Sequence, residues 1–295
     1  MPIDGLLVAT RFGLYADLAA LAGLPLFWWS MRQDVQTGAR RILALLAFGG
    51  PILSALWLIA SAAAMTGTSP IAPDWSVIKI LLQETAIGPL LAIRAIALFM
   101  IPPLLCLSKR RLAPVALLAM AAATTLAWSG HAGATEGAGG TVHRAADMLH
   151  IIAASAWFGA LLALLARIFR SVVDIEQTAL MLQRFSLFGT LFVVTLIISG
   201  AINSVMIVGV ANLPMLLHSL YGWLLLAKIT LFGGMLILAA ANRWRLTPAL
   251  SRAAGSGDLA AAQQHLRLSL TLETALAVTI LALVAALGTL DPLAV

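Results

Sequence analysis

The residues of this chain that are best suited to chemistry lie in one short polar segment between two apolar stretches. Three of the five histidines fall there, at His131, His143 and His150, and Asp147 lies between the last two. Imidazole nitrogens and carboxylate oxygens are ligands for transition metals. An ionisable group at a membrane boundary is costly to desolvate, so it is a functional candidate by default. The segment is therefore the first candidate for a metal site.

Helical spacing places the second part of this segment on one face. His143, Asp147 and His150 lie at positions i, i+4 and i+7, which are neighbours on one side of an α-helix. Such a face can bind a metal, supply an axial haem ligand or relay protons. The alternative interpretation is an aqueous vestibule in which the polar side chains only bond to one another. His218, in a later polar link, is a further candidate ligand.

The composition of the chain places these residues in a membrane protein. Hydrophobic residues make up 61% of the 295 residues and charged residues only 10%, whereas a soluble domain has about 25% charged residues. A helix needs roughly 20 apolar residues to cross a bilayer. We therefore expect an all-α polytopic membrane helix bundle that forms a single integral membrane domain over 1–295. Its eight predicted transmembrane helices are at about 5–29, 42–65, 83–107, 112–129, 142–167, 185–208, 221–242 and 268–290.

The distribution of basic residues predicts how the bundle lies in the membrane. Lys and Arg concentrate in alternate links, and the other links hold at most Lys79 and Arg144. Because cytoplasmic loops carry an excess of Lys and Arg, we expect the basic links in the cytoplasm and both termini in the periplasm. Four of the five histidines then lie near the outer surface. The basic links contain Arg32, Arg40, Arg41, Lys109, Arg110, Arg111, Arg167, Arg170, Arg184, Arg243, Arg245, Arg252 and Arg267.

Several charged residues lie inside the predicted spans. A charge at that depth needs a partner. Matching depths predict two ion pairs, Asp17 with Arg94 and Arg11 with Asp147. We expect the pair of Asp17 and Arg94 to hold helices together.

Other residues could extend a polar or metal path across the bundle. Lys228 and Glu273 are candidates for such steps, although a snorkelling lysine and an interfacial glutamate are equally consistent with the sequence. Met148, Met206 and Met215 lie at the outer ends of spans or in outer links. Thioether sulfur is a soft ligand suited to Cu(I), and methionine is also an ordinary apolar residue of membrane helices.

The sequence also excludes several classes of site. Cys106 is the only cysteine, so an intramolecular disulfide and a thiolate zinc site are excluded. No phosphate-binding loop of the Gly-x-x-x-x-Gly-Lys-Ser/Thr type occurs, and neither His-Glu-x-x-His nor Gly-x-Ser-x-Gly is found. We therefore expect neither an ATP-driven pump nor an enzyme.

Several short motifs follow one another in a defined order over about residues 128–245. They are Gly130-His131-Ala132; Ala146-Asp147-Met148-Leu149-His150 with Trp157-Phe158-Gly159; Arg184-Phe185-Ser186; Ser199-Gly200 with Asn203; Tyr221-Gly222 with Lys228; and Asn242. In this order and spacing the chain resembles the CopD family of bacterial copper-resistance and copper-homeostasis inner-membrane proteins. The first half resembles the family mainly through Arg11, Glu84 and Arg94.

The resemblance implies copper handling across the bacterial inner (plasma) membrane, often alongside a periplasmic copper-binding partner of the CopC type. Because the chain begins directly in its first span, we expect such a partner to be a separate protein. The leading hypothesis is a copper-binding protein that imports copper ions, with His131, His143 and His150 as ligands and His218 as a possible fourth. Asp147 would bind copper directly or orient an imidazole.

Two other hypotheses stay open at this point. A b-type haem-binding electron-transfer protein would use two histidines on facing helices as axial ligands, and His150 and His218 are the natural pair. A non-transporting copper-insertion factor or scaffold would bind copper without moving it across the membrane.

Overall fold

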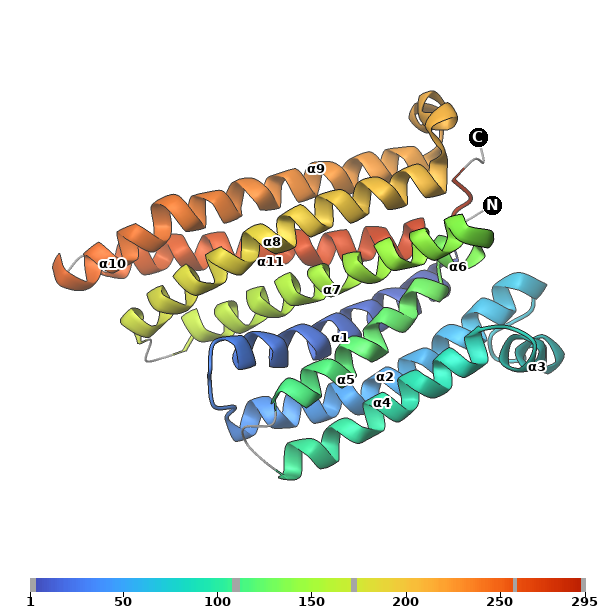
Figure 1. The fold of residues 1–295 in the computed structure, drawn as a ribbon, viewed down its shortest axis with the longest axis horizontal. Helices are drawn as coiled ribbons and strands as arrows, with labels where there is room; N and C mark the ends of the chain where they lie inside the picture. The colour runs from blue at the N-terminus through green and yellow to red at the C-terminus, as the bar shows by residue number, and fades with distance from the viewer. Residues whose placement is uncertain (1–3, 108–111, 171–173, 257–258, 293–295) are drawn as a thin grey trace.

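The computed structural model describes residues 4–107, 112–170, 174–256 and 259–292, and every regular element within them is helical. The long helices lie side by side in one bundle, which confirms the expected all-α fold (Figure 1). The α-helices are α1 (Gly5–Ser30), α2 (Thr37–Thr66), α3 (Trp75–Gln83), α4 (Ile87–Leu107), α5 (Leu112–Thr124), α6 (His131–Ala134), α7 (Gly137–Ile168), α8 (Ile175–Val208), α9 (Leu220–Ala241), α10 (Thr247–Ser256) and α11 (Leu259–Leu287). Two 3-10 helices, η1 (Thr125–Trp128) and η2 (Val210–His218), and the π-helical turn η3 (Asn242–Leu246) complete the described part.

The predicted spans correspond to these elements, although several bounds differ. Within the described residues, seven helices are long and apolar enough to cross a membrane, and α5 with η1 forms a shorter apolar segment, Leu112–Trp128. The third predicted span, 83–107, corresponds to α4, which begins only at Ile87. Gln83 belongs instead to the separate helix α3, which it ends. The helices α7, α8 and α11 begin earlier than predicted, since each helix extends beyond the apolar part on which the prediction was based. At the start of α8, for example, the Asp174 side chain accepts a hydrogen bond from the backbone N–H of Gln177.

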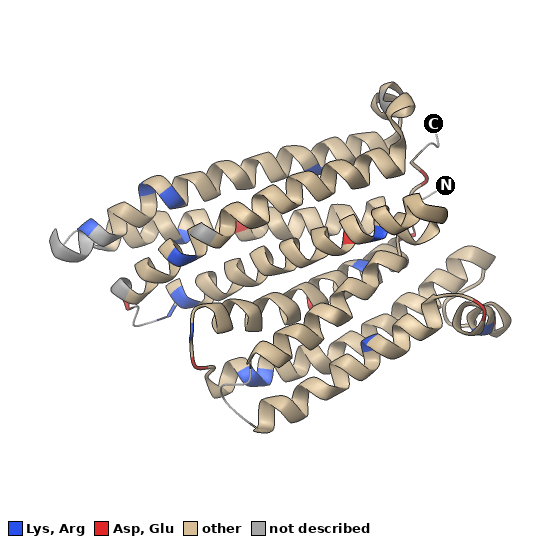
Figure 2. Ribbon diagram, viewed as in Figure 1, with Lys and Arg blue, Asp and Glu red and all other residues tan. Residues whose placement is uncertain are grey.

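Most of the described basic residues gather at one end of the bundle (Figure 2). Hydrogen bonds join the links at this end: Arg170 donates to Gln36 at 3.1 Å, and Arg267 donates to the carbonyl oxygen of Ile168 at 3.0 Å. The start of α1 and the end of α11 lie at the opposite end, together with α6 (Figure 1). The positive-inside rule predicts that the basic end faces the cytoplasm. The predicted basic link at 109–111 lies outside the described residues.

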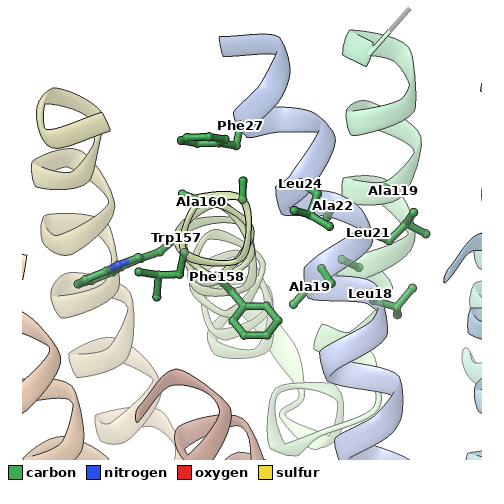
Figure 3. Close-up of a cluster of buried hydrophobic side chains, with 14 of the residues drawn as sticks. Leu18, Ala19, Leu21, Ala22, Leu24, Phe27, Ala119, Trp157, Phe158 and Ala160 are labelled. Atoms are coloured by element: carbon green, nitrogen blue, oxygen red, sulfur yellow. The ribbon is translucent and has the colours of Figure 1, made fainter. Parts of the chain in front are cut away.

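Helix α1 lies at the centre of the packed core. It packs against α2, α5, α7 and α11. Figure 3 shows side chains of α1, among them Leu18, Leu21 and Ala22, between Ala119 of α5 and the neighbouring helix α7. Trp157 points from α7 away from α1, towards the C-terminal helices (Figure 3). Helix α1 therefore joins the N-terminal helices to those that carry the predicted ligands.

The predicted ion pair between Asp17 and Arg94 is wrong. Arg94 is fully buried, but its Nε donates to Thr125 Oγ1 at 2.8 Å and its Nη1 to Ser54 Oγ at 3.1 Å. Asp17 Oδ2 is buried without a hydrogen-bond partner. Equal depth in the membrane does not fix the rotation of a helix, and the rotation decides which side chains meet.

Candidate functional site

Four of the five predicted ligands line one cavity, and the helix that carries three of them begins at the end of the bundle opposite the basic links. This hollow of about 220 Å³, here called the histidine cavity, is enclosed by α1, α5, α6, α7, α8, α9 and α11. As the helical spacing predicts, His143, Asp147 and His150 of α7 all line this cavity. His131 of α6 is the fourth predicted ligand that lines it. The ionisable and amide side chains that line it are Arg11, Tyr15, His131, His143, Asp147, His150, Asn203, Tyr221 and Lys228.

His150 is held with one ring nitrogen available to a metal. Its Nδ1 lies 2.9 Å from Ser199 Oγ, and that hydroxyl donates its own hydrogen to the carbonyl oxygen of Thr195. The hydroxyl has only one hydrogen, so it must accept from Nδ1–H of His150. The Nε2 atom then carries the lone pair that a metal needs.

A hydroxyl group also orients the imidazole of His143. Its Nδ1 lies 2.9 Å from Thr135 Oγ1, and the Thr135 hydroxyl donates to the carbonyl oxygen of His131. The Nδ1–H of His143 therefore donates to Thr135, and Nε2 is the unprotonated nitrogen. His143 is almost fully buried, with 1% of its surface exposed. Sequence reasoning missed Thr135 because a single threonine in a glycine-rich link carries no recognisable signal.

His131 is placed by contacts with two other helices. Its Nε2 lies 3.4 Å from the carbonyl oxygen of Leu287, and its ring meets Tyr221 edge to face with the centroids 6.0 Å apart. Burial lowers the pKa of His131 from its ordinary value of 6.5. The hydrogen bond with the Leu287 carbonyl opposes this shift, and the positive charge of Arg11 adds to it. The imidazole is therefore mainly neutral at neutral pH, which is the form that binds metals.

Asp147 has a different partner from the predicted one. Its Oδ1 accepts a hydrogen bond from Asn203 Nδ2 at 3.0 Å, and its charge interacts with that of Lys228. Arg11 instead donates to the Tyr15 hydroxyl at 2.6 Å. The predicted pair of Arg11 and Asp147 is therefore wrong. The Lys228 charge also acts on His150, so a positive charge lies near the deepest predicted ligand.

His218 does not join this cavity. It lies at the end of η2 with an exposed side chain and lines neither of the cavities that His150 lines. The structure thus does not support the haem pair of His150 and His218. Met148 and Met206 also lie outside the cavity lining, and the Met215 side chain lies outside the described part.

The predicted ligands surround the cavity without forming a closed metal cage. Among the described residues, no three His, Cys, Asp or Glu side chains come together closely enough to hold a metal ion. His131 and His143 are near enough for their charges to interact. The arrangement offers separate donors along a cavity wall, with the unprotonated nitrogens of His143 and His150 defined by their hydroxyl partners.

Two further cavities share lining residues, one with the histidine cavity and the other with that neighbour. The middle cavity, about 320 Å³, shares His150 and Lys228 with the histidine cavity and is also lined by Met235. The glutamate cavity, about 330 Å³, shares Trp157 with the middle cavity and is lined by Glu273. Lys228 therefore faces the interior of the bundle.

Glu273 is buried and bonded to two other helices. Its side chain is 2% exposed, so the interpretation of an interfacial glutamate is wrong. Trp157 Nε1 donates to its Oε1 at 3.0 Å, and Asn242 Nδ2 donates to its Oε2 at 2.8 Å. Sequence reasoning missed this cluster because its three members lie on helices far apart in the chain. It missed Met235 because one apolar residue in an apolar helix gives no signal.

Comparisons with known proteins show the family of the chain. A family model described as "Copper resistance protein D-like, N-terminal domain" matches residues 2–141, and one described as "Copper resistance protein D" matches residues 179–287. Copper resistance protein D of Pseudomonas syringae pv. tomato is 37% identical over 303 aligned positions, which cover 98% of this chain and 97% of the relative. The chain belongs to the copper resistance protein D family.

A second relative and the apolar helices indicate the membrane in which the protein lies. The inner membrane protein YebZ of Escherichia coli (strain K12) is 32% identical over 169 positions, covering 57% of this chain and 55% of that protein. With seven apolar helices of spanning length in its described part, this copper resistance protein D homologue is a multi-pass inner-membrane protein. No solved structure matches the chain.

The histidine cavity draws on both regions that the family models match. His131 lies in the first matched region, whereas Asn203 and Lys228 lie in the second. His143 and His150 lie between the two, within the stretch aligned with the Pseudomonas relative. The cavity is therefore a feature of the whole bundle.

Proposed function

We propose that this protein carries copper ions from the periplasm to the cytoplasm. The observation that carries the proposal is that His131, His143, Asp147 and His150 line one cavity and that His150 also lines the middle cavity. With the basic end in the cytoplasm, copper would enter at the histidine cavity. The role is binding and transfer, with no covalent reaction catalysed.

Separate donors suit transfer better than storage. Conduction requires binding that is strong enough for entry and weak enough for release, usually over several sites in series. A closed cage of four ligands would retain the ion, whereas single imidazoles at successive depths allow it to move on. His131 and His143 would receive the ion first and His150 would pass it into the middle cavity. There the soft sulfur of Met235 is the next available donor.

Copper uptake into sealed proteoliposomes tests the proposal. The purified protein is reconstituted around a trapped copper-sensitive dye, and Cu(I) or Cu(II) is supplied outside. We expect His150→Ala to reduce uptake at least tenfold, while His265→Ala, which changes an exposed histidine near the start of α11, leaves it unchanged. If the wild-type protein binds copper in stoichiometric amounts but gives no flux, transport is refuted and a copper-insertion or scaffold role takes its place.

A separate periplasmic copper-binding protein of the CopC type is the proposed donor. The support is the resemblance noted in the sequence and the position of His131 on α6, at the end of the bundle away from the basic links. In the same vesicles, copper delivered on such a donor should enter faster than the same concentration of free copper held by a small chelator of equal affinity. Equal rates would argue against a dedicated partner.

A further inference from the structure

Glu273 provides a buried carboxylate that the proposed copper path does not use. Both of its oxygens accept hydrogen bonds, from the indole of Trp157 and from the amide of Asn242. Both donors are neutral N–H groups that keep their hydrogens at ordinary pH. The observed bonds therefore satisfy this carboxylate in its charged form.

Asn242 holds an unsatisfied acceptor next to this carboxylate. Its side chain is 7% exposed, and its Oδ1 is buried without a hydrogen-bond partner. A rotation of the amide by half a turn exchanges Oδ1 with Nδ2. Oδ1 could then accept a hydrogen bond from a protonated Glu273. The pair therefore has a bonded arrangement for each protonation state of the carboxyl group.

The backbone at Asn242 is also unusual. The residue begins the π-helical turn η3, which interrupts the path from α9 into α10. Single π-helical turns are rare and occur frequently at functional sites. This turn brings Asn242 to the wall of the glutamate cavity, within hydrogen-bond distance of α11.

Among the described residues, no cation neutralises Glu273 within its cavity. Of the residues that line the cavity from α7, α8, α9, η3, α10 and α11, only Arg243 and Glu273 are charged or titratable near neutral pH. Arg243 Nη1 donates to Thr190 Oγ1 at 2.7 Å and to the carbonyl oxygen of Ser186. Lys228 lines the neighbouring middle cavity. A buried charge without an opposite charge is costly, and the uptake of a proton removes that cost.

The glutamate cavity has room for water beside its few polar side chains. Its volume of about 330 Å³ exceeds the roughly 30 Å³ that one water molecule occupies, although most of the residues that line it are apolar. The polar residues Ser186 and Thr190 line it together with the exposed Arg243 at the basic end of the bundle. Water molecules in this cavity could connect the carboxylate with the solvent at that end.

We infer that Glu273 is a proton-binding site that exchanges protons with the basic end of the bundle through the glutamate cavity. The Asn242 amide turns when the carboxyl group gains or loses its proton, and Trp157 stays bonded to Oε1. This site operates whether or not the protein transports copper, so its test contains no copper.

Infrared difference spectroscopy of the full-length protein in lipid vesicles tests the inference. Spectra are recorded while the pH changes between about 5 and 8, the range in which a functional proton site must titrate. We expect a carbonyl band of a protonated carboxylic acid to appear and disappear reversibly in the wild type. One component of this band should be lost in Glu273→Gln and kept in Asp17→Asn, which changes a second buried carboxyl group.

A second variant keeps the test decisive if Glu273→Gln does not fold. Asn242→Leu removes the amide but keeps the carboxyl group, so the same band should persist with a displaced midpoint. The tryptophan fluorescence should change over the same pH range in the wild type, and Trp157→Phe should remove that change. A difference band that is unchanged in Glu273→Gln, or a midpoint of the Glu273 component that Asn242→Leu does not move, would overturn the inference.

Discussion

Gly23 of α1 and Gly159 of α7 touch through their backbones. A β-carbon built on Gly159 would lie 2.1 Å from the carbonyl carbon of Gly23, and one built on Gly23 would lie 1.9 Å from the carbonyl oxygen of Ser155. Neither distance is compatible with any side chain. Small residues let membrane helices approach closely, and here they dock the N-terminal helices onto the helix that carries His143 and His150.

The first prediction concerns this crossing. Gly159→Ala should destabilise the folded protein by an amount at or above the upper end of the roughly 1–3 kcal/mol typical of overpacking, because backbone atoms of α1 cannot move aside alone. Thermal denaturation in detergent, followed by size-exclusion chromatography, measures the effect. Gly233→Ala is the matched control, since a β-carbon there meets no atom within 4 Å. Equal melting temperatures for the two variants would contradict the close crossing.

The second prediction concerns the hydroxyl groups that orient the imidazoles. Ser199→Ala and Thr135→Val should each weaken copper binding by about 10- to 100-fold, the usual effect of losing a group that orients a metal-binding histidine. Competition with a chromophoric copper chelator gives the affinities. Ser204→Ala serves as the control because Ser204 lines the same cavity but donates to the carbonyl oxygen of Gly200. A similar loss in the control would mean that the cavity as a whole had been disturbed.

The third prediction concerns pH. Because burial and Arg11 lower the pKa of His131 below 6.5, protons should compete for this imidazole only at a lower pH than for an ordinary histidine. In the unfolded chain the histidine takes up its proton first as the pH falls below 6.5, so the folded state loses stability in that range. Nuclear magnetic resonance of the labelled imidazoles should show a His131 midpoint below 6.5. Replacement of Arg11 by Leu should raise that midpoint, and an unchanged midpoint would rule out the electrostatic contribution.

The fourth prediction concerns Lys228. Its positive charge acts on both His150 and Asp147, so it repels a bound cation. Lys228→Leu should tighten copper binding by roughly tenfold, equivalent to about 1.4 kcal/mol. Titration in the presence of a competing chelator measures this change, with Lys79→Leu on the exposed face of α3 as the control. Weaker binding in Lys228→Leu would instead indicate that Lys228 keeps Asp147 in place for the metal.

The sequence by itself determined the membrane bundle and most of the candidate ligands. Apolar length and composition are local properties, and the bilayer leaves few folds open to such a chain. The spacing of His143, Asp147 and His150 determined their common face, since the helical period depends only on the backbone. The same reasoning found the basic end, which lies opposite the end where α7 begins.

Only the tertiary structure decided which side chains meet. Depth along the chain suggested partners for Asp17 and Arg11, but the rotation and crossing of the helices gave both residues different neighbours. The same packing left His218 outside the histidine cavity and brought Trp157, Asn242 and Glu273 together. Contacts between distant helices depend on how whole surfaces fit, as at Gly23 and Gly159, and no local pattern in a sequence contains that information.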